Sequence, residues 1–480
     1  MSAFRWTDAA VREALELSGA RVLPTREGSS GPGAYTGIST DSRTVRPGEL
    51  YVALVGDRFD GHEFVGEALV SGALGAVISR EVDLPPETRL YRVEDTLVAL
   101  GELARHRRQA LDAPVVAITG SSGKTTTKDL LVGALKTTYR VHATPANLNN
   151  RIGLPRTLLD TPGDAQVVVL EAGTNEPGEI GALGRIARPD IAVVTTVGAS
   201  HLEKLGSVQG VLEEKLDLLR ATLPAGRTVV GDEPAELVEA ARTLDREVRV
   251  AGWSDRSDEE LRPQGVEADH WGLHRFTWKG ASVALALPGR HAVSNALLAL
   301  ATAELLGVSV AAAARGIGGV EARGMRGEHR RVGGLTVLVD CYNANPQSVG
   351  AALDLLEAHQ AGRKVAVLGT MLELGEREGE LHRTTLHDAL RRSLDLVVAT
   401  GAFAPAAAGL ELPDTAEVTS RPGAPELLTA ADWSEAYPGL RARLRGDETL
   451  LLKASRGMAM EGMLPWLERD FAAGGAGEDG

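Results

Sequence analysis

The sequence predicts an α/β protein with three domains. A chain of 480 residues is long enough for about three domains, each with its own core. From residue 113 onward, short apolar runs alternate with helical patterns, and the alternation starts a second time after residue 320. Apolar strands separated by helices are typical of parallel sheets that are covered on both faces. We therefore expect domains at residues 1–112, 113–320 and 321–480.

The first domain is expected to be a mixed α/β unit. Its strands are predicted at Leu50–Leu54 and Ala76–Ser79, and it ends in a helix rich in arginine and histidine at Glu94–Leu111. The pattern then changes at Ala113-Pro114.

The second domain is expected to be a parallel-sheet domain like that of P-loop ATPases. Its apolar strands are predicted at Val115–Thr119, Val167–Leu170 and Ile191–Val197. Further along, alternating patterns on either side of a Lys279-Gly280 turn predict an antiparallel hairpin. Its strands are Arg275–Trp278 and Ala281–Leu287, and the helices that follow are expected around Ala296–Leu306 and Ala311–Gly316.

The third domain repeats the strand–helix alternation and is expected to be Rossmann-like, with a second parallel sheet. Its strands are predicted at Thr336–Val339, Lys364–Leu368, Leu394–Ala399 and Leu450–Lys453.

Composition excludes several classes of protein. The chain has 51 Lys and Arg against 65 Asp and Glu, a net charge of −14, which disfavours nucleic acid and membrane surfaces as partners. No stretch approaches the roughly 18 apolar residues of a membrane span, and no signal segment opens the chain, so we expect a cytoplasmic protein. The single cysteine, Cys341, rules out an internal disulfide framework and is expected to be a buried thiol.

A Gly-rich turn after the first strand of the second domain predicts a phosphate site. The segment Thr119-Gly-Ser-Ser-Gly-Lys-Thr-Thr-Thr127 leaves an apolar strand and enters a helix. Two glycines let successive N–H groups face one anion, the helix start adds partial positive charge, and Lys124 adds a full one. The G-x-x-G-K-T spacing is two residues shorter than the usual phosphate loop. A plain turn with a surface lysine is the alternative.

Side chains at neighbouring strand ends suggest a metal beside the phosphates. Glu171 and His201 follow the next two strands, and Thr125 begins the helix after the loop. Ligands collect outside the carboxyl ends of parallel strands. A hydroxyl and a carboxylate suit Mg²⁺, and one imidazole is compatible with Mg²⁺ or Mn²⁺. Singly, Glu171 could be a helix cap and His201 an ordinary loop residue.

Lys215 falls on the apolar face of the helix expected after His201. Val208, Val211, Leu212 and Leu219 share that face at helical spacing. The lysine could extend to solvent. Otherwise its charge must be paired or chemically removed, because an isolated buried ammonium is costly.

Together these motifs resemble the Mur ligase family, the ATP-dependent amide-forming enzymes of bacterial cell-wall synthesis. The phosphate loop is followed in the family's order by Asn147–Pro155, Glu171–Ile180 and His201–Ser207. Asp340–Ser348 and Val367–Glu376 look like the branch that adds D-alanyl-D-alanine. Near the N-terminus, the motifs Thr40–Arg43, Pro47-Gly48 and Asp60–His62 are similar to the family's uridine-nucleotide domain.

The resemblance implies a role for each matching residue. Lys124, Lys215 and His201 would be catalytic, with Lys215 carried as a carbamate. Thr125, Glu171 and His201 would hold magnesium, of which two ions are expected. The residues implied for ATP binding are Gly120, Ser121, Ser122, Gly123, Lys124, Thr125, Thr126, Asn295, Arg326 and Asp340. Those implied for the other substrates are Ser42, Arg43, Asn147, Asn149, Asn150, Tyr342, Asn343 and Asn345.

The implied reaction joins D-alanyl-D-alanine to UDP-N-acetylmuramoyl-tripeptide through an acyl phosphate, in the synthesis of peptidoglycan precursors on which cell shape and division depend. The resemblance assigns the first domain to the UDP-linked substrate, the second to ATP and the third to the incoming dipeptide, in a monomer. Two alternatives stay open. One is another ligase of the superfamily, which adds the third peptide residue or glutamate to folate. The other is a nucleotide-dependent regulatory protein that forms no bond.

Overall fold

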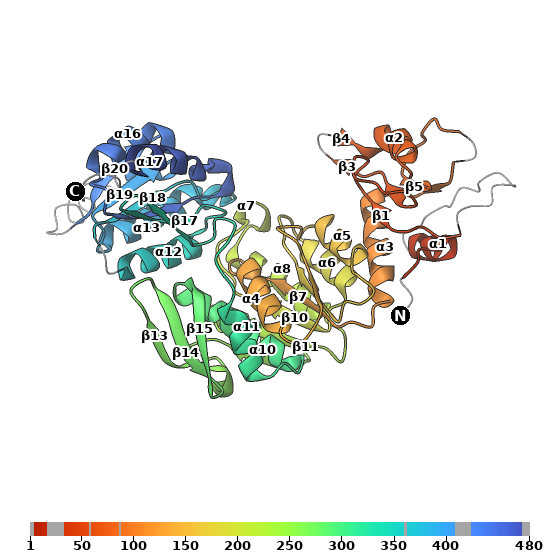
Figure 1. The fold of residues 1–480 in the computed structure, drawn as a ribbon, viewed down its shortest axis with the longest axis horizontal. Coiled ribbons are helices and arrows are strands. Elements are labelled where there is room, and N and C mark those ends of the chain that lie inside the picture. Colours follow the sequence, from red (N-terminus) through yellow and green to blue (C-terminus); the bar gives the residue numbers. More distant parts are fainter. Residues whose placement is uncertain are drawn as a thin grey trace, which may run out of the picture.

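The computed structural model describes residues 4–16, 33–56, 59–85, 88–359, 362–408 and 424–472. They form three α/β units that follow one another along the molecule (Figure 1). This architecture confirms the predicted fold class. No helix within the described ranges is both long enough and apolar enough to cross a membrane.

The N-terminal unit is built on four parallel strands in the order β1-β2-β5-β6. Their bounds are Ile38–Ser39, Leu50–Val52, Gly75–Ile78 and Leu90–Arg92. A small hairpin and three helices complete the unit: β3 (Val55–Gly56), β4 (Phe59–Asp60), α1 (Asp8–Glu16), α2 (Val65–Val70) and α3 (Thr96–Gln109). The expected strands are found as β2 and β5, and the expected helix as α3.

Helix α3 joins the first unit to the second. It packs on α1 within its own unit and on α5 and α6 of the central unit. Two buried arginines in its last turn strengthen the junction: Arg107 donates to the carbonyl of Thr161, and Arg108 lies 2.7 Å from Asp190 Oδ2 and donates to two further carbonyls. The helix is therefore part of both cores.

The central sheet has six strands, all parallel, in the order β12-β11-β10-β7-β9-β8. In chain order β7 to β12 are Val115–Thr119, Val141–Ala143, Val167–Glu171, Ile191–Val194, Arg227–Gly231 and Val248–Ala251. The helices α4 to α11 are Lys124–Leu135, Gly153–Leu159, Glu179–Ala187, Leu202–Leu205, Val208–Arg220, Ala235–Arg242, Arg290–Leu305 and Val310–Gly318. This confirms the three predicted strands.

Both faces of the central sheet are covered. Val116 and Ile118 of β7 enter a core with α4, α10 and α11, whereas Val115 and Ala117 enter a core with α5, α6 and α8. Because alternate residues of a strand point to opposite faces, a strand between two cores must be apolar throughout. The apolar run Val115–Thr119 is the pattern from which β7 was predicted.

An antiparallel sheet lies against the first of these cores. It consists of β13 (Gln264–Ala268), β14 (Leu273–Trp278) and β15 (Ala281–Pro288). The predicted turn joins β14 to β15, and both its residues have positive φ, 45° at Lys279 and 81° at Gly280. Two positive φ values are the geometry that matches the twist of a tight hairpin.

The C-terminal sheet has the order β16-β17-β21-β18-β19-β20. Its strands β16 to β21 are Glu328–Val332, Leu335–Asp340, Lys364–Leu368, Leu396–Thr400, Glu426–Ala430 and Thr449–Lys453. Its helices are α12 (Pro346–Ala358), α13 (Glu378–Arg391), α14 (Phe403–Ala408), α16 (Trp433–Arg443) and α17 (Leu464–Phe471).

One strand of this sheet corrects the prediction of a wholly parallel third domain. β16 runs antiparallel to β17. Its sequence, Glu-His-Arg-Arg-Val, is charged and mostly exposed because it forms an edge of the sheet. An edge strand with one exposed side lacks the apolar run that marks a buried parallel strand.

Candidate active site

The phosphate loop leaves β7 and enters α4 as predicted, and its two glycines are required by the fold. Gly120 has φ +150° and Gly123 has φ +81°. A Cβ on Gly120 would lie 1.9 Å from Thr195 Oγ1, and one on Gly123 would lie 2.3 Å from Asn295 Oδ1. Both contacts are too short for any side chain, so the loop closes tightly on neighbouring segments.

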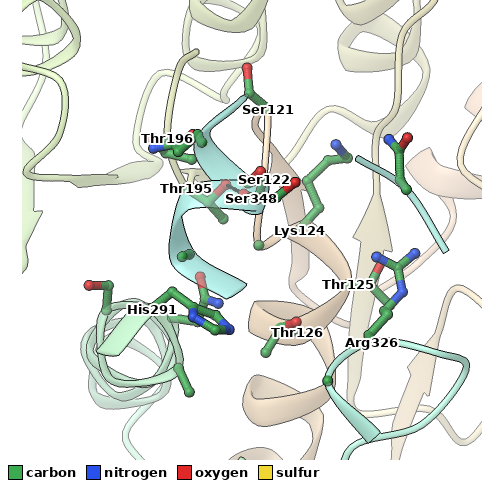
Figure 2. A pocket seen from close by; sticks show the side chains of 18 of the residues that line it. Ser121, Ser122, Lys124, Thr125, Thr126, Thr195, Thr196, His291, Arg326 and Ser348 are labelled. Atoms are coloured by element: carbon green, nitrogen blue, oxygen red, sulfur yellow. Dashed lines mark hydrogen bonds between the residues drawn. The ribbon is translucent and has the colours of Figure 1, made fainter. Parts of the chain in front are cut away.

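The loop is fixed by the chain that follows β10. Ser121 N donates to Thr196 O at 2.8 Å, and Thr195 Oγ1 donates to Ser122 O at 2.5 Å. Lys124 donates from Nζ to the carbonyl of Gly120 at 2.6 Å, and burial lowers the pKa of this lysine. These hydrogen bonds fix the conformation of the loop and hold the Lys124 side chain against it. Figure 2 shows Lys124, Thr125 and Thr126 lining the pocket.

Thr125 and Glu171 are brought together at the end of the sheet. Thr125 Oγ1 donates to Glu171 Oε2 at 2.9 Å, and Asn149 Nδ2 donates to Glu171 Oε1 at 2.8 Å. Glu171 is only 1% exposed, and Lys128 Nζ lies 3.9 Å from its Oε2. A buried carboxylate with a hydroxyl beside it is therefore in place next to the loop.

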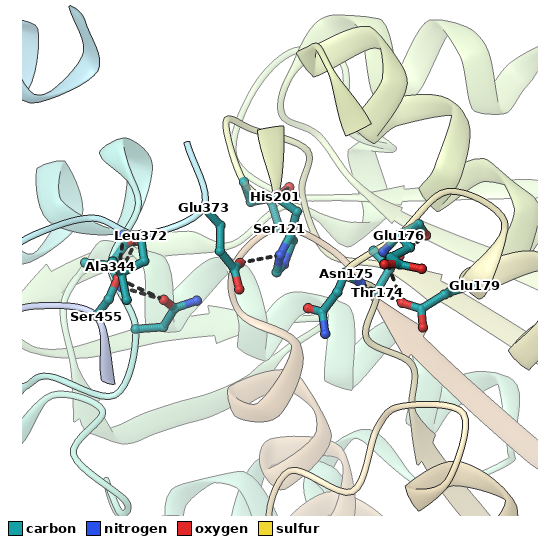
Figure 3. A network of polar contacts seen from close by, with 12 residues as sticks. Ser121, Thr174, Asn175, Glu176, Glu179, His201, Ala344, Leu372, Glu373 and Ser455 are labelled. Carbon is teal, nitrogen blue, oxygen red and sulfur yellow. Dashed lines mark hydrogen bonds and ion pairs between the residues drawn. The ribbon is translucent and has the colours of Figure 1, made fainter. Parts of the chain in front are cut away.

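His201 has a different partner. Its Nδ1 lies 2.5 Å from Oε2 of Glu373, a residue of the C-terminal unit (Figure 3). The hydrogen bond from His201 lowers the pKa of the Glu373 carboxyl. The structure thus unites two of the three residues expected at a metal and pairs the third across the domain junction.

Lys215 does not reach solvent. It lies on α8 with 0% exposure, and its Nζ has no hydrogen-bond partner among the described residues. Burial, and after it the charge of Lys124, lower the pKa of Lys215 well below its usual value. The solvent-exposed alternative is therefore excluded, and burial disfavours the charged form of the amine.

The C-terminal unit touches the loop through the start of α12. Asn345 caps this helix by accepting from Ser348 N, and its Nδ2 donates to Ser122 Oγ at 3.3 Å. Gln347 Nε2 donates to Thr196 Oγ1 at 3.0 Å. Contacts from a helix N-terminus on one unit to the phosphate loop on another enclose the space between them.

Other expected residues of the C-terminal unit lie in the same region. The Arg326 guanidinium stacks over the Tyr342 ring, 3.8 Å from its centroid. Asp340 Oδ2 lies 2.8 Å from Lys453 Nζ, which also donates to the carbonyl of Asn343. The acidic end of β17 is thus neutralised by a buried lysine.

A cavity of about 590 Å³ lies between the central and C-terminal units. Most of the expected residues line it, namely Ser121, Ser122, Gly123, Lys124, Thr125, Thr126, Asn149, Asn150, Glu171, His201, Asn295, Arg326, Asp340, Tyr342, Asn343 and Asn345. Gly120, Asn147 and Lys215 are not among the lining residues. The volume is in the range of small-molecule sites.

Ser42 and Arg43 belong to the N-terminal unit and do not line this cavity. Ser42 is buried, whereas the Arg43 side chain is 80% exposed and forms two hydrogen bonds to Asp41. The Arg43 guanidinium lowers the pKa of the Asp41 carboxyl to about 2.

Comparison with known proteins identifies the family. The model of the Mur ligase middle domain matches residues 118–303, the glutamate ligase domain of Mur ligases matches 325–456, and the catalytic domain of the family matches 34–108. The UDP-N-acetylmuramoyl-tripeptide–D-alanyl-D-alanine ligase of Bacillus subtilis is 40% identical over 353 residues, which cover 72% of this chain and 76% of the relative. The chain belongs to the Mur ligase family.

Solved structures of Mur ligases agree with this assignment. A crystal structure of MurF from Acinetobacter baumannii superposes with a TM-score of 0.86 at 30% identity and covers 98% of this chain and 100% of its own. MurF ligase from Thermotoga maritima in complex with ADP gives a TM-score of 0.78 at 28% identity, over 91% and 98% of the two chains. The resemblance expected from the motifs is confirmed.

Many further residues of this Mur ligase line the cavity without having been predicted, among them Lys453, Trp253 and Arg290. Lys453 ends an apolar strand, and a lysine at that position was the available signal. Trp253 donates from Nε1 to Ser294 Oγ, and the Arg290 guanidinium lies 4.5 Å from the centroid of its ring. No local pattern pointed to Trp253 and Arg290, because they come from separate segments that only the fold brings together.

Proposed function

We propose that this Mur ligase joins D-alanyl-D-alanine to UDP-N-acetylmuramoyl-tripeptide at the expense of ATP, forming an amide bond in peptidoglycan precursor synthesis. The observation that carries the proposal is the shared cavity. The phosphate loop of the central unit and the Tyr342–Asn345 loop of the C-terminal unit line one space. The two substrates proposed here are those in the name of the related B. subtilis enzyme, UDP-N-acetylmuramoyl-tripeptide–D-alanyl-D-alanine ligase.

The donor set fits a magnesium ion. Thr125 and Glu171 offer a hydroxyl and a buried carboxylate, whereas no three His, Cys, Asp or Glu side chains in the described ranges form a metal-binding group by themselves. Mg²⁺ commonly takes one or two carboxylates and completes its shell with substrate phosphates and water. Thr125 and Glu171 would hold the ion, with His201 near the phosphates, and the ion would supply positive charge to the triphosphate.

Lys215 fits a carbamate. A neutral amine adds CO₂ to give a carbamate and releases one proton, and this turns a disfavoured buried cation into an anion. The absence of a described partner for Nζ and the lowered pKa support this proposal. The carbamate would carry its negative charge toward the bound cation.

The reaction would proceed in two steps. The terminal carboxylate of the tripeptide attacks the γ-phosphorus of ATP, which gives an acyl phosphate and ADP. The neutral amine of D-alanyl-D-alanine then attacks the acyl carbon, phosphate leaves with the bonding electrons, and the nitrogen gives up one proton, which the phosphate can take. The work of the protein is to position these groups and to stabilise charge. Lys124 and the loop N–H groups would bind the phosphates, and Arg326 would approach from the C-terminal unit.

The three units would divide the substrates among them. Residues 1–112, with Ser42 and Arg43, would bind the UDP end, residues 113–320 would bind ATP through the loop and Asn295, and residues 321–480 would receive the dipeptide. We further propose a monomeric, cytoplasmic enzyme whose C-terminal unit closes on the central unit. Small-angle scattering should show compaction when an ATP analogue and the UDP-linked substrate are added.

The decisive experiment measures phosphate release and identifies the product by mass spectrometry. The proposal expects phosphate release only with both UDP-N-acetylmuramoyl-tripeptide and D-alanyl-D-alanine, and a product of the summed mass less one water. ATP turnover without either substrate would favour a regulatory protein. Activity with a free amino acid in place of the dipeptide, or with a folate, would favour another ligase of the superfamily. Supplying tripeptides with diaminopimelate or lysine would show which is accepted.

A further inference from the structure

His201 and Glu373 meet across the junction of two units. His201 follows β10 and precedes α7, whereas Glu373 lies between β18 and the short helix η3 (Gly375–Arg377). The imidazole Nδ1 and carboxylate Oε2 are 2.5 Å apart, and Figure 3 shows the two side chains pointing toward each other from their separate segments. The pair thus joins the central unit to the C-terminal unit beside the cavity.

The main chains meet at the same place. Glu203 N, in α7, donates to the carbonyl of Glu373 at 3.2 Å. Gly375 has φ +59°, and a Cβ there would lie 2.9 Å from the Cα of Glu203. The loop of the C-terminal unit therefore packs directly on α7. The His201–Glu373 pair is one part of this close-packed contact.

Both members of the pair have an unusual backbone. His201 has φ +53° and Glu373 has φ +65°. This left-handed region is costly for residues that carry a Cβ, and it persists where the surroundings hold the residue in place. Two such residues opposite one another indicate that the orientation of their side chains is constrained.

Glu373 does not line the cavity but is paired with a residue that does. His201 lines the cavity and its side chain is 15% exposed, whereas the Glu373 side chain is 50% exposed and is not among the lining residues. The carboxylate oxygen lies against Nδ1, so the imidazole would act on the site through its other ring nitrogen, Nε2. A carboxylate bound to one ring nitrogen fixes the tautomer and direction of an imidazole.

We propose that Glu373 is a positioning residue that orients His201 when the C-terminal unit docks on the central unit, so that docking and completion of the site are one event. Glu373 belongs to the unit that we propose to close, and His201 belongs to the unit that we propose to bind the phosphates. The inference rests on the proposed ligase function for its kinetic consequence, but the docking itself can be measured without substrates.

The test compares Glu373→Gln with Glu376→Gln in the full-length protein. The first variant keeps the shape of the side chain and removes the charge that pairs with His201. The second removes the same charge three residues away, where the described part of the chain offers the side chain no hydrogen bond or ion pair. Thermal unfolding of each variant checks that both fold.

Docking is read by distance measurements between spin labels at Glu239→Cys on α9 and Arg391→Cys on α13. Both positions are exposed, and the native Cys341 is buried and will not label. Glu373→Gln should broaden the distance distribution toward longer values, whereas Glu376→Gln should keep that of the wild type.

In the ligase assay, Glu373→Gln should lower kcat about tenfold and leave the KM for ATP within about twofold.

Glu373→Asp should recover part of the lost kcat, since it restores the charge. Unchanged distances in Glu373→Gln would overturn the proposal, even if kcat fell, because positioning would then not depend on docking. Changed distances with wild-type kcat would overturn it as well. If the wild-type protein has no ligase activity, the proposed function fails, while the distance comparison still decides whether the pair controls docking.

Discussion

Lys215 lies buried within electrostatic reach of Lys124, and burial together with the charge of Lys124 lowers the pKa of the Lys215 amine. Two lysines directed to one region would repel each other if both were charged. Lys124 lines the cavity, where anionic phosphates would compensate its charge, so we expect Lys215 to be the lysine whose charge changes.

Replacing Lys215 by methionine should therefore stabilise the protein in CO₂-free buffer. The change removes a buried, unpartnered nitrogen, whose cost is about 1–3 kcal/mol. Between the lowered folded pKa and the usual value of 10.5, the unfolded chain binds more protons, so wild-type stability rises with pH. The advantage of Lys215→Met should shrink as the pH approaches 10.5. Thermal unfolding measured across this range provides the check.

Lys128→Met is the matched control for that experiment. Lys128 is also buried, but its Nζ donates to the carbonyl of Thr144 and lies 3.4 Å from Asp129. Its loss should destabilise the protein. With ¹³C-labelled bicarbonate, a carbamate resonance should appear in the wild type and in Lys128→Met and be absent from Lys215→Met. A resonance that survives in Lys215→Met would disprove the assignment.

Lys124→Ala should lower kcat by about 10²–10³-fold, because it removes the full positive charge beside the phosphates. Lys136→Ala is the control, since Lys136 caps the far end of the same helix and is exposed. Phosphate release with both substrates present measures the effect. Wild-type rates in Lys124→Ala would remove the loop from the mechanism.

Gly123→Ala should weaken ATP binding more than its backbone strain alone explains. Gly123 and Gly178 both have φ +81° and both precede a helix, but a Cβ on Gly178 would meet nothing within 4 Å. Each alanine carries a strain of about 1–3 kcal/mol, and only the one at Gly123 collides with Asn295. Titration with a fluorescent ATP analogue should show lost affinity in Gly123→Ala and unchanged affinity in Gly178→Ala. Equal affinity in the two variants would argue against the loop as the ATP site.

Arg43→Ala should raise the KM for the UDP-linked substrate about tenfold, which corresponds to the loss of one charged hydrogen bond. The KM for ATP should stay the same, since Arg43 lies in the N-terminal unit and does not line the cavity. Arg46→Ala, in the same exposed segment, serves as the control. An increased KM for ATP instead would place Arg43 in a different role.

The parts of the fold that the sequence predicted share one property, a pattern confined to a single segment. β7 and β18 are apolar throughout because both their faces are buried, and they were found with the observed bounds. β16 was missed because an exposed edge carries charges. Within the site, the loop and the strand-end residues could be placed in advance because parallel strands end at one edge. The pairing of His201 with Glu373 could not, because it depends on how two units dock.

Helix α3 has a consequence for the geometry of the whole enzyme. Its 14 residues span about 21 Å at 1.5 Å per residue, and its last turn is anchored to the central unit through Arg107 and Arg108. The length of α3 therefore sets the distance between the N-terminal unit and the central unit that carries the phosphate loop. A single inserted residue would lengthen it slightly but rotate everything before it by about 100°, so its length should tolerate change far less than its exposed side chains.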